Sequence, residues 1–317
     1  MVEKVGQRLS GGEKSRVDAS RIVEILGHFW EEEERSVREM IRKSHGPKAL
    51  HEVRRSFRRR IRIGIFIGFA GCLSRSSRKD LAVLGKAYAV LGPWRERDVR
   101  EKAWRQLCRR IPDIRKCAPL SRMGEEGKDH RRRRRLLERV LRKAERCAFP
   151  GCPSRLKSFR KEPVGDSSVF FFRLRTFLAD RDAVLERFAA RWDVLGAEGR
   201  HRLRKVVRVL HESWSLARKL VPDLPDGESD QILAKLDRSL GRLHDLDMSF
   251  KRLCRVLESS GRKGRRQALL VGWYAGVSGH LYLQVGQLLE RYRKAPRPWA
   301  PVENRPFSSS DGFSPTG

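Results

Sequence analysis

The segment from His51 to Arg62 reads HEVRRSFRRRIR, and it separates into a charged stripe and an apolar stripe if it is helical. With a rotation of about 100° per residue, the cationic residues fall within a sector of about 100°. They are His51, Arg54, Arg55, Arg58 and Arg62. The neighbouring apolar stripe consists of Leu50, Val53, Phe57 and Ile61. Because cations this close repel one another, the charged stripe is expected to face water, carboxylates or a bound polyanion.

The same arrangement recurs 150 residues later, in HRLRKVVRVLHESW from His201 to Trp214. Its cationic residues, which match the first four of the earlier stripe, are His201, Arg204, Lys205 and Arg208. A second pattern also recurs, as LGPWRERDV from Leu91 to Val99 and as LGRLHDLDM from Leu240 to Met248, 149 residues apart. Two patterns that repeat at nearly one spacing predict a duplicated helical unit.

The overall charge favours a polyanionic partner. The chain has 317 residues, and its 71 Lys and Arg against 39 Asp and Glu give a formal charge of +32, far above what solubility requires. Nucleic acid, an acidic membrane surface and inorganic polyphosphate are the partners that such a charge fits.

Helical periodicity predicts an all-α protein of four helices followed by four more. The expected helices cover about 21–43, 48–74, 79–110 and 129–147, then 168–195, 200–221, 228–259 and 262–293, with Pro93 bending the third. The predicted division is a flexible N-terminus at 1–19, a first half at 20–149, a linker at 150–167, a second half at 168–293 and a disordered tail at 294–317.

Other features of the sequence predict a cytoplasmic protein without a cofactor or metal. The longest apolar run, Ile63 to Leu73, is too short to span a bilayer, and the opening residues lack the apolar core of a secretory signal. The six cysteines show no zinc-site spacing, so we expect reduced thiols, with a labile disulfide between Cys147 and Cys152 as the alternative.

The paired motifs resemble the CHAD domain, the conserved-histidine α-helical domain family, whose halves each carry a His-x-x-Arg helix followed by an LG…(R/N)D…D segment. The matching residues are His51, Arg54, Arg58, Arg59, Leu91, Gly92, Arg95 and Asp98 in the first half, and His201, Arg204, Lys205, Arg208, Leu240, Gly241, Asp245 and Asp247 in the second. The resemblance covers roughly residues 20–293. The chain departs from the family pattern at Arg60 and Ile61, which transfers a basic role to Arg62, and at Glu96 and His211.

This resemblance implies two four-helix bundles related by an internal pseudo-two-fold axis, with a basic cleft that binds inorganic polyphosphate without enzymatic activity and targets the protein to polyphosphate granules. The residues implied to bind are His51, Arg54, Arg55, Arg58, Arg59, Arg62, His201, Arg204, Lys205 and Arg208, with Arg95, Asp98, Asp245 and Asp247 in supporting roles. The chemistry agrees, because arginine makes planar, often bidentate hydrogen bonds to phosphate oxygens and lysine adds point charge.

Two roles stay open for the histidines. As ligands they would donate to phosphate and bind better below their ordinary pKa of about 6.5. As structural residues they would bond to a carboxylate, for which Asp98 and Asp247 are the candidates. The run from Arg131 to Arg135 is read as a solvated helix start, or as an extension of a polyanion path.

Two other functions compete with polyphosphate binding. Nucleic-acid binding fits the charge, but the sequence carries no recognised nucleic-acid motif and no aromatic ladder. Cleavage of polyphosphate or triphosphate needs converging carboxylates to hold Mg²⁺, whereas the repeated acids here are few. The ExExK strand motif of the CYTH domain, to which many CHAD domains are fused, is absent from the sequence. The pattern does not predict an oligomeric state.

Overall fold

The structure is a computed structural model that describes residues 19–43, 46–70, 75–110, 132, 134–140, 142, 167–221, 224, 227–259 and 264–299. The predicted N-terminal segment, the linker before residue 167, the tail after residue 299 and the pair Cys147 and Cys152 lie outside these residues. Within the described part the chain is helical and contains no strand, which confirms the predicted all-α class. None of the described helices is both long and apolar enough to cross a membrane.

The helices divide into two units by their packing. One contains Met1–Val99 with Pro119–Leu174, and the other contains Arg100–Ala118 with Arg175–Gly317. Two helices, α5 (Gly92–Arg110) and α9 (Ser167–Ala189), therefore contribute residues to both units. The first residues of α9, which the sequence assigned to the second half, pack in the first unit, where Phe170 is buried against Phe66.

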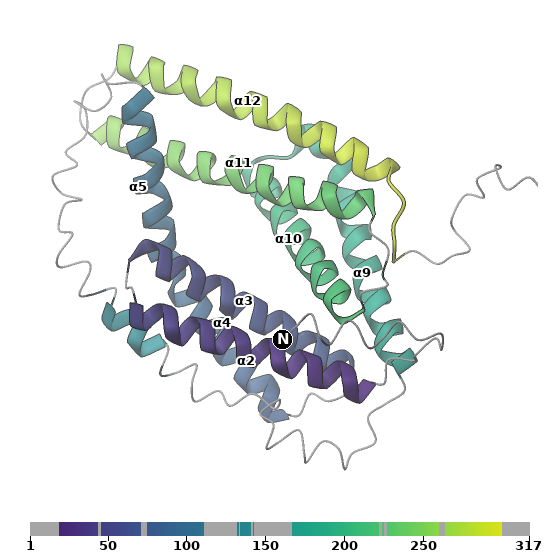
Figure 1. The fold of residues 1–317 in the computed structure, drawn as a ribbon. Helices are drawn as coiled ribbons and strands as arrows, with labels where there is room; N and C mark the ends of the chain where they lie inside the picture. Colours follow the sequence, from purple (N-terminus) through teal and green to yellow (C-terminus); the bar gives the residue numbers. More distant parts are fainter. Residues whose placement is uncertain are drawn as a thin grey trace, which may run out of the picture. The chain divides into compact units, whose positions relative to one another are not determined.

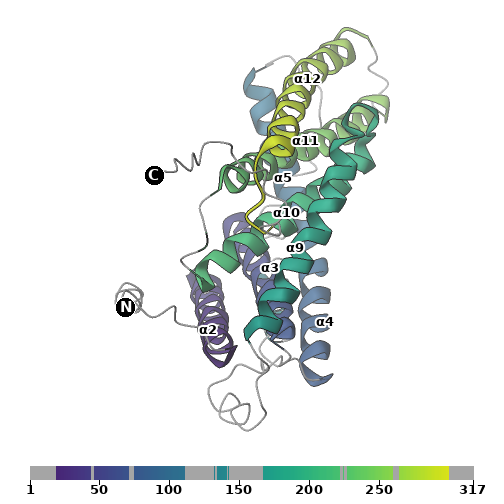
Figure 2. The same cartoon turned by 90° about the vertical axis from the view of Figure 1, so that its right-hand side faces the viewer.

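In the first unit α3 (Pro47–Phe69) lies between α2 (Ala19–Lys43) and α4 (Arg75–Val90), as Figure 2 shows. Pro47 begins α3 without losing a helical hydrogen bond, because the first amide groups of a helix have no partner within it. The predicted apolar residues Leu50, Val53 and Phe57 are buried. Gly64 allows α3 and α4 to approach closely, since a Cβ atom there would lie 2.3 Å from a methyl carbon of Leu81.

A charged residue lies in the core of this unit, where the sequence predicted Ile61 instead. Arg60 is 1% exposed, whereas Ile61 is only half-buried. From α2, Glu34 forms an ion pair with Arg60 at 3.4 Å, and the Trp30 ring lies 4.2 Å from its guanidinium carbon. A buried cation is tolerated when an anion and an aromatic face replace its water, and α2 supplies both.

The predicted third helix is two helices rather than one bent helix. α4 ends at Val90, Leu91 forms a turn, and α5 begins at Gly92. Pro93 has no amide hydrogen and its ring excludes the carbonyl of the preceding turn, so it is compatible with a new helix start but not with the interior of a continuous helix.

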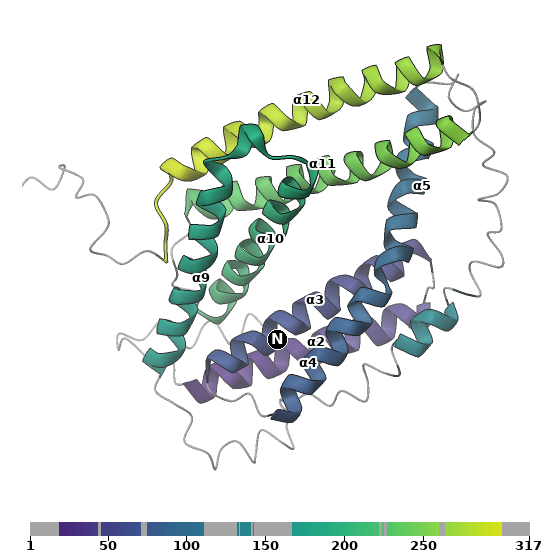
Figure 3. The ribbon, with the colours of Figure 1, turned by 180° about the vertical axis from the view of Figure 1, so that it is seen from behind.

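In the second unit α11 (Glu228–Ser259) packs against α10 (Ala197–Leu220) on one side and α12 (Arg265–Lys294) on the other, as Figure 3 shows. Figure 1 shows α12 returning alongside α11 in the opposite direction. Leucines repeat along α10 and α11, among them Leu203, Leu210, Leu236, Leu243 and Leu246, and all of these are buried. Before α10 the short 3-10 helix η2 (Trp192–Val194) buries Trp192, whose ring stacks on that of Tyr282.

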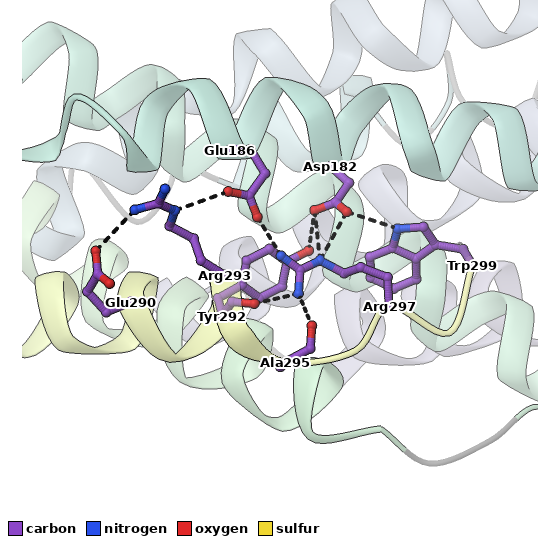
Figure 4. A network of polar contacts seen from close by, with 8 residues as sticks. All are labelled: Asp182, Glu186, Glu290, Tyr292, Arg293, Ala295, Arg297 and Trp299. Atoms are coloured by element: carbon purple, nitrogen blue, oxygen red, sulfur yellow. Dashed lines mark hydrogen bonds and ion pairs between the residues drawn. The ribbon is translucent and has the colours of Figure 1, made fainter. Parts of the chain in front are cut away.

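The prediction that the chain is disordered after residue 294 is wrong for residues 295–299. Arg297 donates through Nε to both carboxylate oxygens of Asp182 on α9, at 3.2 and 3.0 Å, and also pairs with Glu186 (Figure 4). Its guanidinium carbon lies 3.7 Å from the centre of the Tyr292 ring. Trp299 donates to the same Asp182 carboxylate and packs its buried ring against Trp214. One arginine therefore anchors a segment whose Pro-rich composition suggested disorder.

This anchor makes Arg297 a testable determinant of stability. We expect Arg297→Ala to lower the free energy of unfolding by roughly 2–4 kcal/mol, because it leaves the half-buried carboxylate of Asp182 without the cation that pairs with it and removes the closer of the two cations of Glu186, the other being Arg293. Arg291→Ala is the matched control, since its ion pair with Glu228 is exposed and should contribute less than about 1 kcal/mol. Urea unfolding followed by circular dichroism measures both, and equal effects would contradict the anchoring role.

Candidate functional site

The first motif lies along α3, whose geometry places its predicted binding residues beside the buried stripe. Arg54, Arg58 and Arg62 are half-buried, whereas His51 and Arg55 are exposed. The predicted supporting residues lie at the start of α5, where Arg95 is half-buried and Asp98 is buried. Partial desolvation lowers the pKa of His51, and the charge of Arg95 lowers it further. Arg95 of α5 therefore adds its positive charge to that of the cationic stripe on α3.

Specific neighbours hold several of these arginines. The guanidinium carbon of Arg54 lies 4.6 Å from the centre of the Tyr88 ring on α4. Arg59 pairs with Glu33 of α2 at 2.6 Å, while Arg55 makes a longer contact of 3.7 Å with Glu52. Arg54 and Arg59 are thus oriented by groups on other helices, whereas among the described residues Arg55 pairs with Glu52 of its own helix.

The second motif lies along α10, and its cations have the same exposure pattern, whereas His201 is half-buried. Arg204 and Arg208 are half-buried and Lys205 is exposed. Arg208 pairs with Asp237 of α11 at 2.9 Å. The Arg204 side chain extends over Gly241 of α11, where a Cβ atom would lie 3.9 Å from its Nε. Lys205 makes no ion pair with any residue in the described part of the chain.

Asp247, a predicted supporting residue, orients an arginine and a tyrosine. Arg200 donates to its Oδ2 at 3.0 Å, and the Tyr274 hydroxyl on α12 donates to its Oδ1 at 2.6 Å. Burial and this carboxylate raise the pKa of Tyr274 to about 12. The other predicted acid of this motif, Asp245, is half-buried on α11.

The two histidines of the second unit stack on each other. The rings of His201 on α10 and His244 on α11 have centroids 4.5 Å apart and an interplanar angle of 26°. Within the described structure, the Nδ1 atom of His201 is buried and has no hydrogen-bond partner. The carboxylate partner considered for His201, Asp247, is instead bonded to Arg200 and Tyr274.

The surroundings keep these imidazoles neutral near pH 7. Desolvation lowers the pKa of His244 to about 4, and the charges of Arg204 and His201 contribute. Desolvation followed by Lys205 and Arg204 lowers the pKa of His201 as well. Both rings therefore lie in a positive potential that disfavours a further positive charge.

Each motif can bind anions, because hydrogen-bond donors and cations converge on one face. In the part of the chain that is described, no group of three or more His, Cys, Asp or Glu side chains is placed to hold a metal ion.

Of the arginine run at 131–135, the exposed Arg134 pairs with Glu138 on its own helix, while Arg131 and Arg133 lie outside the described residues.

Sequence reasoning missed four residues that complete the two motifs: Tyr88, Arg200, His244 and Tyr274. His244 stands inside the repeated LG pattern, and Arg200 directly precedes His201, so both could have been found by extending the repeat. Tyr88 and Tyr274 have no such signal, because only packing between helices brings their rings to Arg54 and Asp247.

No model of a known protein family matches this sequence, and no curated protein matches it. Among solved structures, the CHAD domain from the plant Ricinus communis is similar, with a TM-score of 0.59 over 88% of this chain and 94% of that chain. The two sequences are 18% identical. This likeness confirms the predicted CHAD fold, while the internal two-fold relation between halves and the roles of the site residues stay predictions.

The low pKa of His244 predicts a loss of stability in acid. Its value of about 4 in the folded chain lies below the ordinary 6.5, so the unfolded chain binds the proton first as the pH falls. The stability linked to His244 is therefore complete above pH 6.5 and is lost between pH 6.5 and 4, by an amount on the order of 2–3 kcal/mol.

His244→Phe tests this directly, because phenylalanine keeps the stacked ring and cannot take up a proton. Between pH 7 and 4, we expect the free energy of unfolding of the wild type to fall by roughly 2 kcal/mol more than that of the variant. His280→Phe, at an exposed position on α12, is the control. Identical pH profiles for wild type and His244→Phe would show that His244 is not the group that titrates.

Proposed function

We propose that this chain, which has the fold of a CHAD domain, binds inorganic polyphosphate without catalysis through the cationic faces of α3 and α10. The observation that carries the proposal is the recurrence of one arrangement on two helices. In each, a histidine and several cations share one face, some of the cations are held by neighbouring side chains, and one is exposed. The exposed cations are Arg55 and Lys205, which stand at corresponding positions of the repeat.

Polyphosphate fits these faces better than a ligand that must be recognised by shape. It is a flexible chain with about one negative charge per phosphate and no bases, so closely spaced cations are sufficient to bind it. Arginines that Glu33, Tyr88 or Asp237 already orient lose less conformational freedom when a phosphate binds. Such pre-orientation raises affinity for a ligand that presents charge at regular intervals.

The proposal includes a cellular role for the bound chain. A protein that binds polyphosphate through two faces would associate with polyphosphate granules in the cytoplasm. Association along a polymer needs no chemical step, which agrees with a binding protein rather than a hydrolase. RNA is the alternative polyanionic ligand. Competition between RNA and polyphosphate for the protein at one salt concentration distinguishes the two ligands.

Charge reversal at the two exposed cations tests the binding faces. We expect Arg55→Glu and Lys205→Glu each to weaken binding of labelled long-chain polyphosphate by roughly threefold to tenfold and to reduce its salt dependence, because each removes a phosphate contact. Fluorescence anisotropy across a salt series measures both quantities. These positions are preferable to Arg59 and Arg208, whose reversal would break ion pairs to other helices, with Glu33 and Asp237.

Matched charge reversals off the two stripes serve as controls. Arg202→Glu lies on α10 about 100° from His201, and Lys43→Glu lies at the exposed end of α2. Both change the net charge by the same amount and should weaken binding less than twofold. Equal loss in controls and site variants, or equal displacement of polyphosphate by RNA, would reduce the proposal to a general basic surface.

The absence of catalysis is tested separately. We expect purified protein with long-chain polyphosphate and Mg²⁺ to release no more inorganic phosphate than a buffer blank, because the proposal assigns no residue to phosphoryl transfer. Ion chromatography of the reaction over several hours measures the release. Mg²⁺-dependent release that Asp98→Asn abolishes would instead identify an enzyme.

A further inference from the structure

The two motifs differ at one position of the LG pattern. Arg95 is the fifth residue of LGPWRERDV, and His244 is the fifth residue of LGRLHDLDM. Each acts on the histidine of its own motif: Arg95 lowers the pKa of His51, and His244 stacks on His201. A permanent cation in the first motif is thus replaced by a titratable group in the second.

Charged groups from each neighbouring helix surround this titratable group. From α10, Arg204, His201 and Arg208 act on His244, and all three oppose its protonation. On α11 itself, Asp247 favours protonation, but its two oxygens already accept hydrogen bonds from Arg200 and from Tyr274 of α12. An anion bound beside His244 would therefore contact cations and hydrogen-bond donors. It would also reduce the electrostatic repulsion between those cations.

We infer that His201 and His244 form a phosphate subsite in the second motif that takes up a proton when a phosphate chain binds. This inference rests on the proposed function and adds a regulatory property to it. The stacked pair accepts one proton rather than two, because two imidazolium rings 4.5 Å apart would repel each other. The proton comes from solvent, and the imidazolium then donates an N–H hydrogen bond to a phosphate oxygen.

The consequence is an affinity that increases as the pH falls. The empty site keeps both imidazoles neutral near pH 7, whereas the bound phosphates stabilise the protonated pair. For each proton taken up on binding, affinity can rise by at most about tenfold per pH unit. The first motif has arginine at the corresponding position, so its contribution to the affinity for polyphosphate should change less over the same pH range.

Calorimetry of the full chain with long-chain inorganic polyphosphate tests the subsite. At pH 5.5, titration in two buffers of different ionisation enthalpy measures the protons taken up on binding, and long chains keep the contribution of terminal phosphates small. We expect the wild type to take up about one proton and its affinity to increase roughly tenfold between pH 7 and 5.5. His244→Phe should lose most of the proton uptake and most of this increase in affinity.

His244→Arg provides the opposite change, because it introduces the permanent cation found at Arg95 in the first motif. We expect it to bind at pH 7 about as tightly as the wild type does at pH 5.5, with little proton uptake. His280→Phe on α12 is the control for loss of a histidine elsewhere and should behave as the wild type. Circular dichroism at both pH values establishes that each variant is folded.

The possible outcomes distinguish failure of this inference from failure of the proposed polyphosphate binding. If the wild type binds polyphosphate but its proton uptake is unchanged in both His244→Phe and His201→Phe, the subsite is wrong and the proposed function stands. If the wild type does not bind polyphosphate at either pH, both are wrong. NMR titration of the histidine ring protons gives a second readout, since the pKa of His244 must rise when polyphosphate is added.

Discussion

Repulsion between like charges on one helix face is the constraint on which both motifs depend. The chain has far fewer carboxylates than cations, so each acid that pairs with a motif arginine determines where that arginine lies. Glu33 holds Arg59, Glu34 compensates the buried Arg60, and Asp237 holds Arg208. The remaining positive charge stays at the surface of α3 and α10, where a polyanion can replace the missing carboxylates.

The two motifs meet this constraint differently, which makes them electrostatically unequal. The first combines permanent cations with the aromatic ring of Tyr88. The second brings two imidazoles together and directs Asp247 toward Arg200 and Tyr274. The second motif therefore has a titratable imidazole at the position where the first motif has the permanent cation Arg95. A repeat in sequence therefore need not be a repeat in electrostatics.

Most of the helices could be predicted because apolar residues recur with helical periodicity over long segments. The predictions failed where a single contact overrides local composition. The predicted third helix is divided, since α4 ends at Val90 and α5, which contains Pro93 in its first turn, begins at Gly92. The apolar pattern alone could not place Arg60 in the core, because its partners Trp30 and Glu34 lie on a different helix. Residues 295–299 carried a signal of disorder, yet Arg297 anchors them to α9.

The all-α class, the cationic stripes and the resemblance to CHAD domains can be read from the residues alone, because helical period, charge and motif spacing are properties of consecutive residues. Which cations are held and which are exposed depends on how the helices pack, and so does the contact of His201 with His244 rather than with Asp247. The physical reason is that a pKa, an ion pair or a stacked ring depends on distances between helices. Those distances arise from core packing, so residues far apart in the chain determine them together.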